Sequence, residues 1–474
     1  MLFNSLEFLL FFPLVALLFH IIPFSGFRFP FLFAASYFFY MWWRPEYIFL
    51  ILLSTAIDYF AGLWMPKVGT QRGKKMLLTA SILTNLGLLG AFKYFTFVLY
   101  TLNLFGNWMG FPTLSAQAGW VLPVGISFYT FQSMSYTVDV YRGRLKPERN
   151  PLQFALYVAY FPQLVAGPIE RAGHLLPQLK NPKPLTSDGL QQGVALILWG
   201  LYKKMVIADG LARWVDPVYS RPEQYGGGDY LIATYAFAFQ ILADFSGYTD
   251  VARGAARILG IELSENFQKP YFAFSIQDFW RKWHISLSSW LKDYLYIPLG
   301  GSRRGTTRTY YNLLLTMALG GLWHGASWNF VIWGAFHGGL LAVGKWVRDW
   351  RGSENPPPTG WRRSLRQIAT FHLVCVGWIF FRAADLPAAL QILTGVFSLR
   401  RPVLPRDWGH GALIIFISTF LFLLMESLAG ENPTVDWLRR KNNTWILTPV
   451  LFWVLLTLAL FSAGTSQQFI YFQF

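Results

Sequence analysis

The sequence predicts an all-α protein that crosses a membrane many times, and three observations lead to this prediction. Hydrophobic residues make up 54% of the 474 positions and charged residues only 14%, whereas soluble globular chains carry about 25% charged residues. Apolar runs recur along the chain, with lengths near the ~20 residues that a helix needs to cross a bilayer. The basic residues gather in short segments between these runs.

We expect about eleven membrane-spanning helices. The first apolar run lacks the basic start and the small-residue cleavage site of a secretory signal peptide, and more apolar runs follow at once, so we expect it to be retained as a helix. The expected spans are residues 6–24, 29–43, 47–65, 76–105, 119–135, 152–169, 189–209, 229–245, 366–382, 411–428 and 444–463.

The chain is expected to form one membrane domain over residues 1–474. Residues 351–360, RGSENPPPTG, contain three prolines and predict a linker. This linker would separate an N-terminal block, residues 1–350, from C-terminal helices at 361–474. The functional core is expected within residues 244–345.

The distribution of basic residues predicts an orientation. Lys67, Arg72, Lys74 and Lys75 follow the third expected span, and short cytoplasmic loops are enriched in lysine and arginine. Placing this cluster in the cytoplasm puts the N-terminus on the periplasmic side. Topology thus explains most of the net charge of +16, so we expect no nucleic-acid partner. The surplus would also attract membrane lipid head groups or an anionic substrate.

Several kinds of chemistry leave no signature in this chain. The single cysteine, Cys375, rules out a disulfide within the chain and a cysteine metal cluster, and its apolar neighbours predict a packed thiol. There is no G-x-S-x-G elbow, Walker A loop, H-E-x-x-H motif or dinucleotide fingerprint. The sequence therefore favours neither a serine hydrolase, nor an ATPase, nor a zinc enzyme, and we expect no metal site.

Residues 262–309 are too polar to span a membrane but rich in aromatic residues. Ser275 is placed to cap a helix, with Asp278 in its first turn. Apolar residues then recur at helical spacing from Ile276 to Tyr294, which predicts one amphipathic helix, interfacial or re-entrant, that ends at Pro298. His284 lies on the apolar stripe and should point inward, where a catalytic and a structural role are equally open.

His324 lies in GGLWHGASW, between the short apolar runs 310–323 and 326–343. The flanking glycines predict a helix broken at membrane depth, which is tolerated only next to protein or a water-filled cavity. An ionisable side chain there indicates function, and histidine titrates near neutrality, which suits a general base. The alternative is a buried histidine that only makes a hydrogen bond.

The remaining polar candidates have simpler interpretations. His20, His372 and His410 are expected to be structural or interfacial, and His174 to be solvated. His337 follows His324 by thirteen residues, which would place the two on different faces of one helix, so we expect a packing or hydrogen-bonding group. Three carboxylates are candidates for inward-facing polar groups or helix caps: Asp58, Asp244 and Asp250.

Several long motifs resemble the membrane-bound O-acyltransferase superfamily. They are GGLWHGASWNFVIWGAFHG, DFWRKWHISLSSWLKDYLYIPLGGSRRG and YFPQLVAGPIER, and LPVGISFYTFQSMSYTVDVYRG, DFSGYTDVARGAARILGI and ENFQKPY extend the match. The likeness is closest to the bacterial branch that contains the membrane component of alginate O-acetylation. It covers at least residues 1–345, while the C-terminal third matches mainly in hydrophobic character.

The resemblance implies that His324 is the catalytic histidine and His284 the second active-site histidine. It implies a central tunnel, an acyl donor that enters from the cytoplasm, acetyl-CoA or a related acyl thioester rather than a bound cofactor, and a periplasmic polysaccharide O-acetyltransferase that receives the acetyl group. It also implies location in a bacterial inner membrane. The substrate-binding candidates are Trp323, Lys282, Arg303, Arg304, Asp244 and Asn266, of which the three cations would meet donor phosphates.

Alternatives of two kinds remain open at this stage. The same chemistry could serve another envelope acceptor: peptidoglycan, cellulose, or a D-alanyl group bound for teichoic acid. A histidine-dependent transporter or flippase would also use broken helices at mid-membrane, and a scaffold that only recruits the periplasmic transferase would tolerate loss of both histidines.

Overall fold

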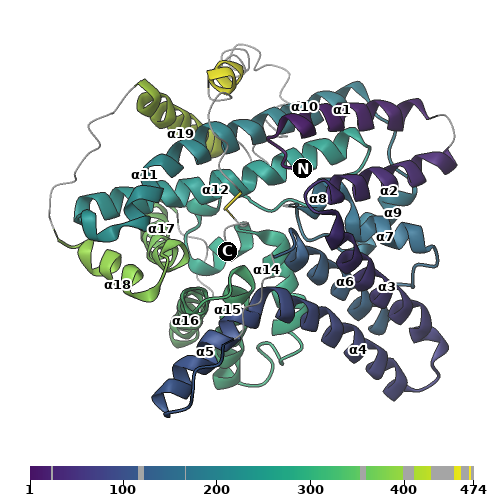
Figure 1. Cartoon of the computed structure of the whole chain (residues 1–474). Coiled ribbons are helices and arrows are strands. Elements are labelled where there is room, and N and C mark those ends of the chain that lie inside the picture. The colour runs from purple at the N-terminus through teal and green to yellow at the C-terminus, as the bar shows by residue number, and fades with distance from the viewer. Residues whose placement is uncertain are drawn as a thin grey trace. The chain divides into compact units, whose positions relative to one another are not determined.

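The structure is a computed structural model (Figure 1), which describes residues 1–22, 25–115, 122–165, 167–352, 359–398, 410–428, 453–460 and 469–470. These residues form helices joined by turns and loops and contain no β-strand, which confirms the predicted all-α class. They fall into two compact units. Unit 1 comprises Met1–Leu190 with Ala255–Leu263, and unit 2 comprises Gln191–Gly254 with Ser264–Phe474.

Four helical segments among the described residues are long and apolar enough to cross a membrane: Pro45–Lys67, Gln71–Trp108, Trp328–Arg351 and Gly360–Arg382. Three of them coincide with the predicted spans 47–65, 76–105 and 366–382. The fourth, Trp328–Arg351, overlaps the run 326–343, which we predicted only as a short segment beside His324. Residues 353–358 of the expected linker and much of the expected span 444–463 lie outside the described residues.

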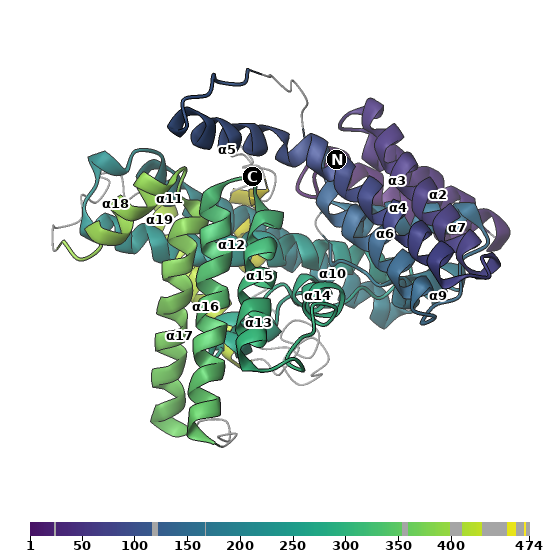
Figure 2. The same cartoon turned by 90° about the horizontal axis from the view of Figure 1, so that it is seen from below.

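Unit 1 is built from short and medium helices. They are α1 (Leu6–Ile21), α2 (Ser25–Met41), α3 (Ile48–Trp64), α4 (Gln71–Leu89), α5 (Phe95–Trp108), α6 (Ile126–Tyr141), α7 (Pro151–Ala159), α8 (Phe161–Leu164) and α9 (Ala172–Lys180). A π-helical turn, η3 (Gly90–Tyr94), joins α4 to α5. Helices α3, α4 and α6 lie side by side (Figure 2).

A fully buried carboxylate links these three helices. Asp58 of α3 accepts hydrogen bonds from Ser81, from Asn85 Nδ2 at 2.9 Å and from Thr137 Oγ1 at 2.8 Å. A buried charge is tolerated when hydrogen bonds replace its hydration. Asp58 is therefore one of the inward-facing polar groups that the sequence predicted.

Unit 2 holds the longer helices and the carboxyl-terminal part of the chain. Its helices are α11 (Asp209–Ser220), α13 (Ile276–Lys282), α14 (Ile285–Leu291), α15 (Thr306–His324), α16 (Trp328–Arg351), α17 (Gly360–Arg382), α18 (Leu386–Gly395) and α19 (His410–Leu428), with most of α10 (Ser187–Tyr202) and of α12 (Gly227–Ile258). Helices α15, α16 and α17 run alongside one another, in green in Figure 2.

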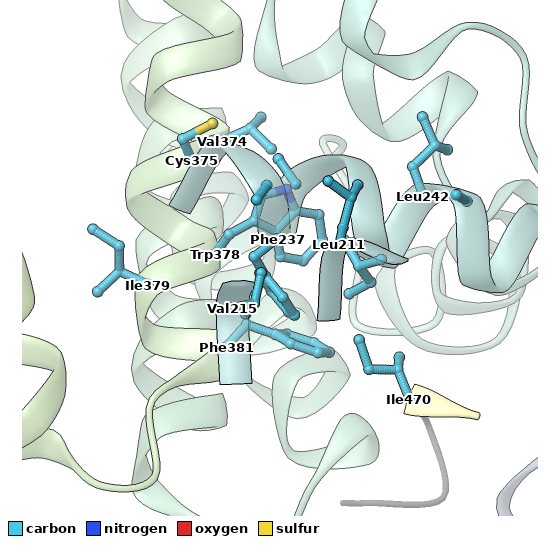
Figure 3. Packing of buried hydrophobic residues seen from close by; sticks show 14 of the residues in the cluster. Leu211, Val215, Phe237, Leu242, Val374, Cys375, Trp378, Ile379, Phe381 and Ile470 are labelled. Atoms are coloured by element: carbon cyan, nitrogen blue, oxygen red, sulfur yellow. The ribbon is translucent and has the colours of Figure 1, made fainter. Parts of the chain in front are cut away.

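The core of unit 2 is rich in aromatic side chains. Trp378 and Phe381 of α17 point toward Phe237 of α12, and their ring centroids lie 6.3 and 6.4 Å from that of Phe237 (Figure 3). Leu211 and Val215 of α11 fill the space beside them. Truncating a buried phenylalanine or tryptophan to alanine typically costs about 3–5 kcal/mol, so this cluster fixes α17 against α11 and α12.

A second π-helical segment, η4 (Lys203–Ala208), lies between α10 and α11 and carries two buried lysines. Lys203 Nζ lies 2.6 Å from Asp250, and Lys204 Nζ lies 2.8 Å from Asp244 and 2.7 Å from Asp209. Breaking a buried ion pair leaves an uncompensated charge and is strongly destabilising. The network therefore holds η4 against α12.

Candidate active site

His324 is the last residue of α15 and is almost completely buried. The helix ends there because Gly325 leaves the helical conformation, with φ −158° and ψ 149°. Phe330 fills the space where a side chain at 325 would lie, since a Cβ on Gly325 would come within 2.0 Å of its ring. The break predicted beside His324 is therefore confirmed, and α16 starts three residues later at Trp328.

Glycines bring α15 and α16 into close contact. A Cβ on Gly321 would lie 2.0 Å from the Phe330 carbonyl oxygen, and one on Gly334 would lie 2.1 Å from the Met317 carbonyl oxygen. Real Cβ atoms do not approach other atoms this closely, so both positions require glycine. The two helices thus form a tight hairpin with His324 at its turn.

His284 lies between α13 and α14, where we expected one continuous helix. That expectation was wrong, because α13 ends at Lys282, Trp283 is extended, and His284 adopts a left-handed backbone conformation, with φ 43° and ψ 55°. Ser275 caps α13 as predicted, accepting a hydrogen bond from the Asp278 amide. The left-handed region is costly for a residue with a Cβ, and non-glycine residues held there cluster at functional sites.

Asn266 fastens this break in the chain. Its backbone carbonyl accepts a hydrogen bond from Ile285 N at 3.0 Å, and its side-chain Oδ1 accepts one from Ser286 N at 3.1 Å. These two amides open α14, and the His284 side chain makes no capping hydrogen bond to them. Asn266, a substrate-binding candidate in the sequence, is thus placed where it holds the backbone of His284.

The structure brings the two histidines together. Their ring centroids lie 6.3 Å apart, although 39 residues separate them in the chain. Aromatic rings surround both: Phe245 lies 4.7 Å from His284, while Trp333 and Phe381 lie 5.1 and 5.4 Å from His324. Trp323 packs near both imidazoles, at 6.0 and 5.0 Å. Two imidazoles in an aromatic enclosure can exchange a proton with a substrate while water is kept away.

Burial sets the charge state of His284. This residue lies outside the four candidate membrane spans and is fully buried. Removal from water lowers its pKa from 6.5 to about 3, because desolvation disfavours the charged form. A neutral imidazole carries one donor and one acceptor nitrogen, so His284 can donate a hydrogen bond without carrying a charge.

The other substrate-binding candidates lie at different places. Lys282 pairs with Asp278 at 3.0 Å, one helical turn earlier. Arg303 and Arg304 lie exposed in the turn before α15, at the opposite end of that helix from His324, a rise of about 27 Å. Asp244 pairs with Lys204 and accepts a hydrogen bond from Ile470 N at 2.7 Å.

Some residues of the site were not singled out from the sequence. Phe245, Trp333 and Phe381 surround the histidines, but aromatic residues are so frequent here, at 19% of the chain, that none stands out. Outside the ring enclosure, the buried Lys203 and Lys204 were not singled out either, although two adjacent charges inside the apolar segment 189–209 are a detectable signal. Charges within such a segment face the protein interior or a cavity.

The remaining histidines have partners or packing of their own. His20 Nε2 bonds to the Ile258 carbonyl at 2.8 Å, and His372 bonds to Tyr235 and to the Ile368 carbonyl, both structural roles. His174 is half-exposed and pairs with buried Glu170 at 2.7 Å, which raises the pKa of His174 above 6.5. The side chain of His410 lies outside the described residues, and Cys375 is buried as predicted.

Comparisons with known proteins identify the family of this chain. The model of the membrane-bound O-acyltransferase family, MBOAT, matches residues 144–384, a stretch that contains both histidines. The chain is 42% identical to the probable alginate O-acetylase AlgI of Azotobacter vinelandii, over 84% of this chain and 78% of that protein. It is 38% identical over the full length of both chains to the probable alginate O-acetylase AlgI of Pseudomonas putida.

A third relative carries a different name. The chain is 36% identical to the peptidoglycan O-acetyltransferase of Helicobacter pylori, over 77% of this chain and 73% of that protein. The family model covers more than half of the chain. The relatives are named as O-acetylases or O-acetyltransferases, so their names share O-acyl transfer. The paired histidines at the end of α15 and at the α13–α14 break therefore lie in an acyltransferase, and the chain belongs to the membrane-bound O-acyltransferase family.

Proposed function

We propose that this enzyme takes an acetyl group from a cytoplasmic acyl thioester, acetyl-CoA or a related carrier, and transfers or relays it for O-acetylation of an exported polysaccharide such as alginate. The observation that carries the proposal is the pair of imidazoles, 6.3 Å apart between centroids, inside an aromatic enclosure. The two relatives named as probable alginate O-acetylases support the choice of polymer.

The proposed reaction exchanges one bond for another. An acceptor hydroxyl attacks the acetyl carbonyl, so that a C–O bond forms and the C–S bond of the thioester breaks. His324 takes the hydroxyl proton and passes it to the departing thiolate, while neutral His284 orients the acceptor or donates to the developing negative charge. Positioning lowers such barriers by about 7–11 kcal/mol, and a well-placed base contributes roughly 10²–10⁴-fold.

We place this chemistry in a bacterial inner membrane with the N-terminus in the periplasm. The basic residues after α3, from Lys67 to Lys75, support a cytoplasmic position for that loop. The acetyl group would pass to a periplasmic polysaccharide O-acetyltransferase. Because the only cysteine is buried, Asn4→Cys and Arg72→Cys can each serve as the single reactive thiol in a labelling experiment on intact cells. An impermeant maleimide should label the first and not the second, and the reverse result would overturn the orientation.

The reaction itself can be tested with purified protein and labelled acetyl-CoA. The assay contains the periplasmic transferase and alginate oligosaccharides, and compares wild type with His324→Ala, His284→Ala and the control His372→Ala. We expect thioester consumption and labelled polymer with wild type and the control. His324→Ala should lose about 10²–10⁴-fold in rate, and His284→Ala should be strongly impaired, with all variants folded.

Other results would point to the alternatives. Peptidoglycan fragments in place of alginate test the acceptor suggested by the Helicobacter pylori relative. Labelling of these fragments alone would keep the chemistry and replace the polymer, and cellulose or a teichoic-acid D-alanyl substrate can be tried in the same way. Transport of a substrate without thioester consumption would favour a transporter. Full activity of both histidine variants would favour a scaffold that only recruits the periplasmic transferase.

A further inference from the structure

A third imidazole, that of His337, lies near the proposed active site and is linked to His324 through the indole of Trp333. His337 of α16 is fully buried, and its ring centroid lies 5.1 Å from that of Trp333, which in turn lies 5.1 Å from His324. Trp280 and Phe279 of α13 cover its other sides, at 5.2 and 6.1 Å. Trp333 therefore stands between two imidazoles and touches both.

The polar atoms of this cluster lack hydrogen-bond partners within the part of the chain that the structure describes. They are both ring nitrogens of His337 and the indole Nε1 atoms of Trp333 and Trp280. A buried donor without a partner carries the full penalty of desolvation, and native proteins satisfy nearly all such groups. Three such residues next to one another indicate that a polar molecule binds among them.

Two of these nitrogens face the same glycine. A Cβ built on Gly377 of α17 would lie 2.7 Å from His337 Nε2 and 3.4 Å from Trp333 Nε1. Any side chain at 377 would therefore displace the imidazole. Glycine at this position allows both nitrogens to lie close to the backbone of α17.

The chemistry of Trp333 Nε1 and His337 Nε2 indicates which kind of molecule binds there. An indole N–H only donates, whereas an imidazole nitrogen donates or accepts. The bound molecule must accept a hydrogen bond from Trp333 and form a hydrogen bond with His337. It must also be small, because His337, Trp333 and Trp280 are all buried. Buried waters bind in such places when they find two to four polar partners.

We propose that His337 is a positioning residue: with an internal water held at Gly377, it fixes the Trp333 indole against His324. The indole meets the His324 ring edge to face, at an interplanar angle of 89°. A hydrogen bond at Nε1 prevents Trp333 from rotating and thereby sets the orientation of the catalytic imidazole. The role of His324 in this inference rests on the proposed function.

Kinetics of three variants test the positioning role in the acetyl-transfer assay. His337→Phe keeps the ring and removes both nitrogens, His337→Gln keeps hydrogen-bonding groups, and Gly377→Ala fills the space at the glycine. We expect kcat to fall about tenfold or more in His337→Phe and Gly377→Ala, because small misplacements of catalytic groups are costly. KM should stay within twofold of wild type, and His337→Gln should retain most of kcat.

The matched control is Gly339→Ala in α16, where a Cβ meets nothing within 4 Å. It should leave kcat, KM and thermal stability unchanged. Unchanged kcat in His337→Phe would overturn the proposal. Equal loss in His337→Gln and His337→Phe would overturn it too, since packing rather than hydrogen bonding would then explain the effect.

A structural measurement keeps the proposal testable if a variant fails to fold or if no acetyl transfer is found. A cryo-EM map of the wild-type protein in nanodiscs, at a resolution that reveals ordered waters, should show density within hydrogen-bond distance of Trp333 Nε1 and His337 Nε2. Ordered side chains without such density would refute the water. Water density without wild-type acetyl transfer would leave the site standing and refute the proposed function instead.

Discussion

The two histidines that we propose for the active site are positioned in different ways. His324 ends a regular helix of 19 residues, and close glycine packing between α15 and α16 fixes that helix end. His284 lies in left-handed backbone between two helices of seven residues each, where Asn266 ties the chain. One imidazole thus depends on contacts along a whole hairpin, and the other on a single unusual residue conformation and its anchor.

The largest effect is expected from the hairpin. Gly334→Ala would place a carbon 2.1 Å from the Met317 carbonyl oxygen, so α15 and α16 must move apart. Such overpacking costs about 1–3 kcal/mol. We expect a lower midpoint of thermal unfolding in detergent and a strong loss of acetyl transfer, while Gly339→Ala melts like wild type. A Gly334→Ala enzyme with normal stability and activity would show that the hairpin does not position His324.

The anchor of His284 is the next test. Asn266→Ala removes the acceptor for the buried Ser286 amide, and a hydrogen bond of this kind contributes about 1 kcal/mol. We expect a modest loss of stability and a several-fold lower kcat in the labelled-acetyl assay. Asn266→Asp keeps the acceptor oxygen and should lose less of both. Equal kcat in wild type, Asn266→Ala and Asn266→Asp would show that Asn266 does not position His284.

The backbone of His284 can be tested apart from its imidazole. His284→Gly and His284→Ala both lose the ring and should both be inactive. Left-handed backbone costs a residue with a Cβ about 1–2 kcal/mol, so His284→Gly should unfold at the higher denaturant concentration. In α14 itself, Ser288→Gly should be less stable than Ser288→Ala. The same order at both positions would mean that His284 carries no backbone strain.

The last test concerns pH. The folded pKa of His284, about 3, lies below the ordinary 6.5, so its burial favours folding above pH 6.5 and this contribution is lost as pH falls toward 3. The raised pKa of His174, paired with Glu170, gives the opposite sign. Its contribution is present below pH 6.5 and is lost as pH rises through the folded pKa.

Stability measured against pH separates the two histidines. His284→Phe should flatten the decline of unfolding free energy on the acid side of pH 6.5. His174→Gln should flatten only the decline on the alkaline side, and by less, since His174 is half-exposed. A change on the alkaline side in His284→Phe would contradict the buried, neutral state of that imidazole.

The sequence predicted the backbone around His324 better than the backbone around His284, for a physical reason. The glycines beside His324 signal a helix break directly, and Gly325 provides it. Around His284 the apolar stripe continues without glycine or proline, so helical periodicity predicts one continuous helix. It predicts that the His284 side chain points inward, but it does not predict the break. The left-handed turn depends on Asn266, eighteen residues earlier, which no local pattern reveals.

His337 shows the same limit. Counting thirteen residues from His324 along one helix places the two on different faces, but the chain leaves the helix at Gly325 and starts a new one at Trp328. The periodicity therefore restarts, and Trp333 comes to lie between the two imidazoles. Long apolar helices such as α3 and α17 were predictable because length and composition alone determine them.

The π-helical segment η4 imposes a constraint on the number of residues as well as on their identity. A π turn holds one more residue than an α turn, and within it two consecutive lysines, Lys203 and Lys204, both reach carboxylates of α12. Deleting one residue would restore ordinary α-helical winding and change the directions in which the two lysines of this turn point. A single-codon deletion here should therefore be worse tolerated than most substitutions, because it would turn a paired lysine away from its acid without changing either residue.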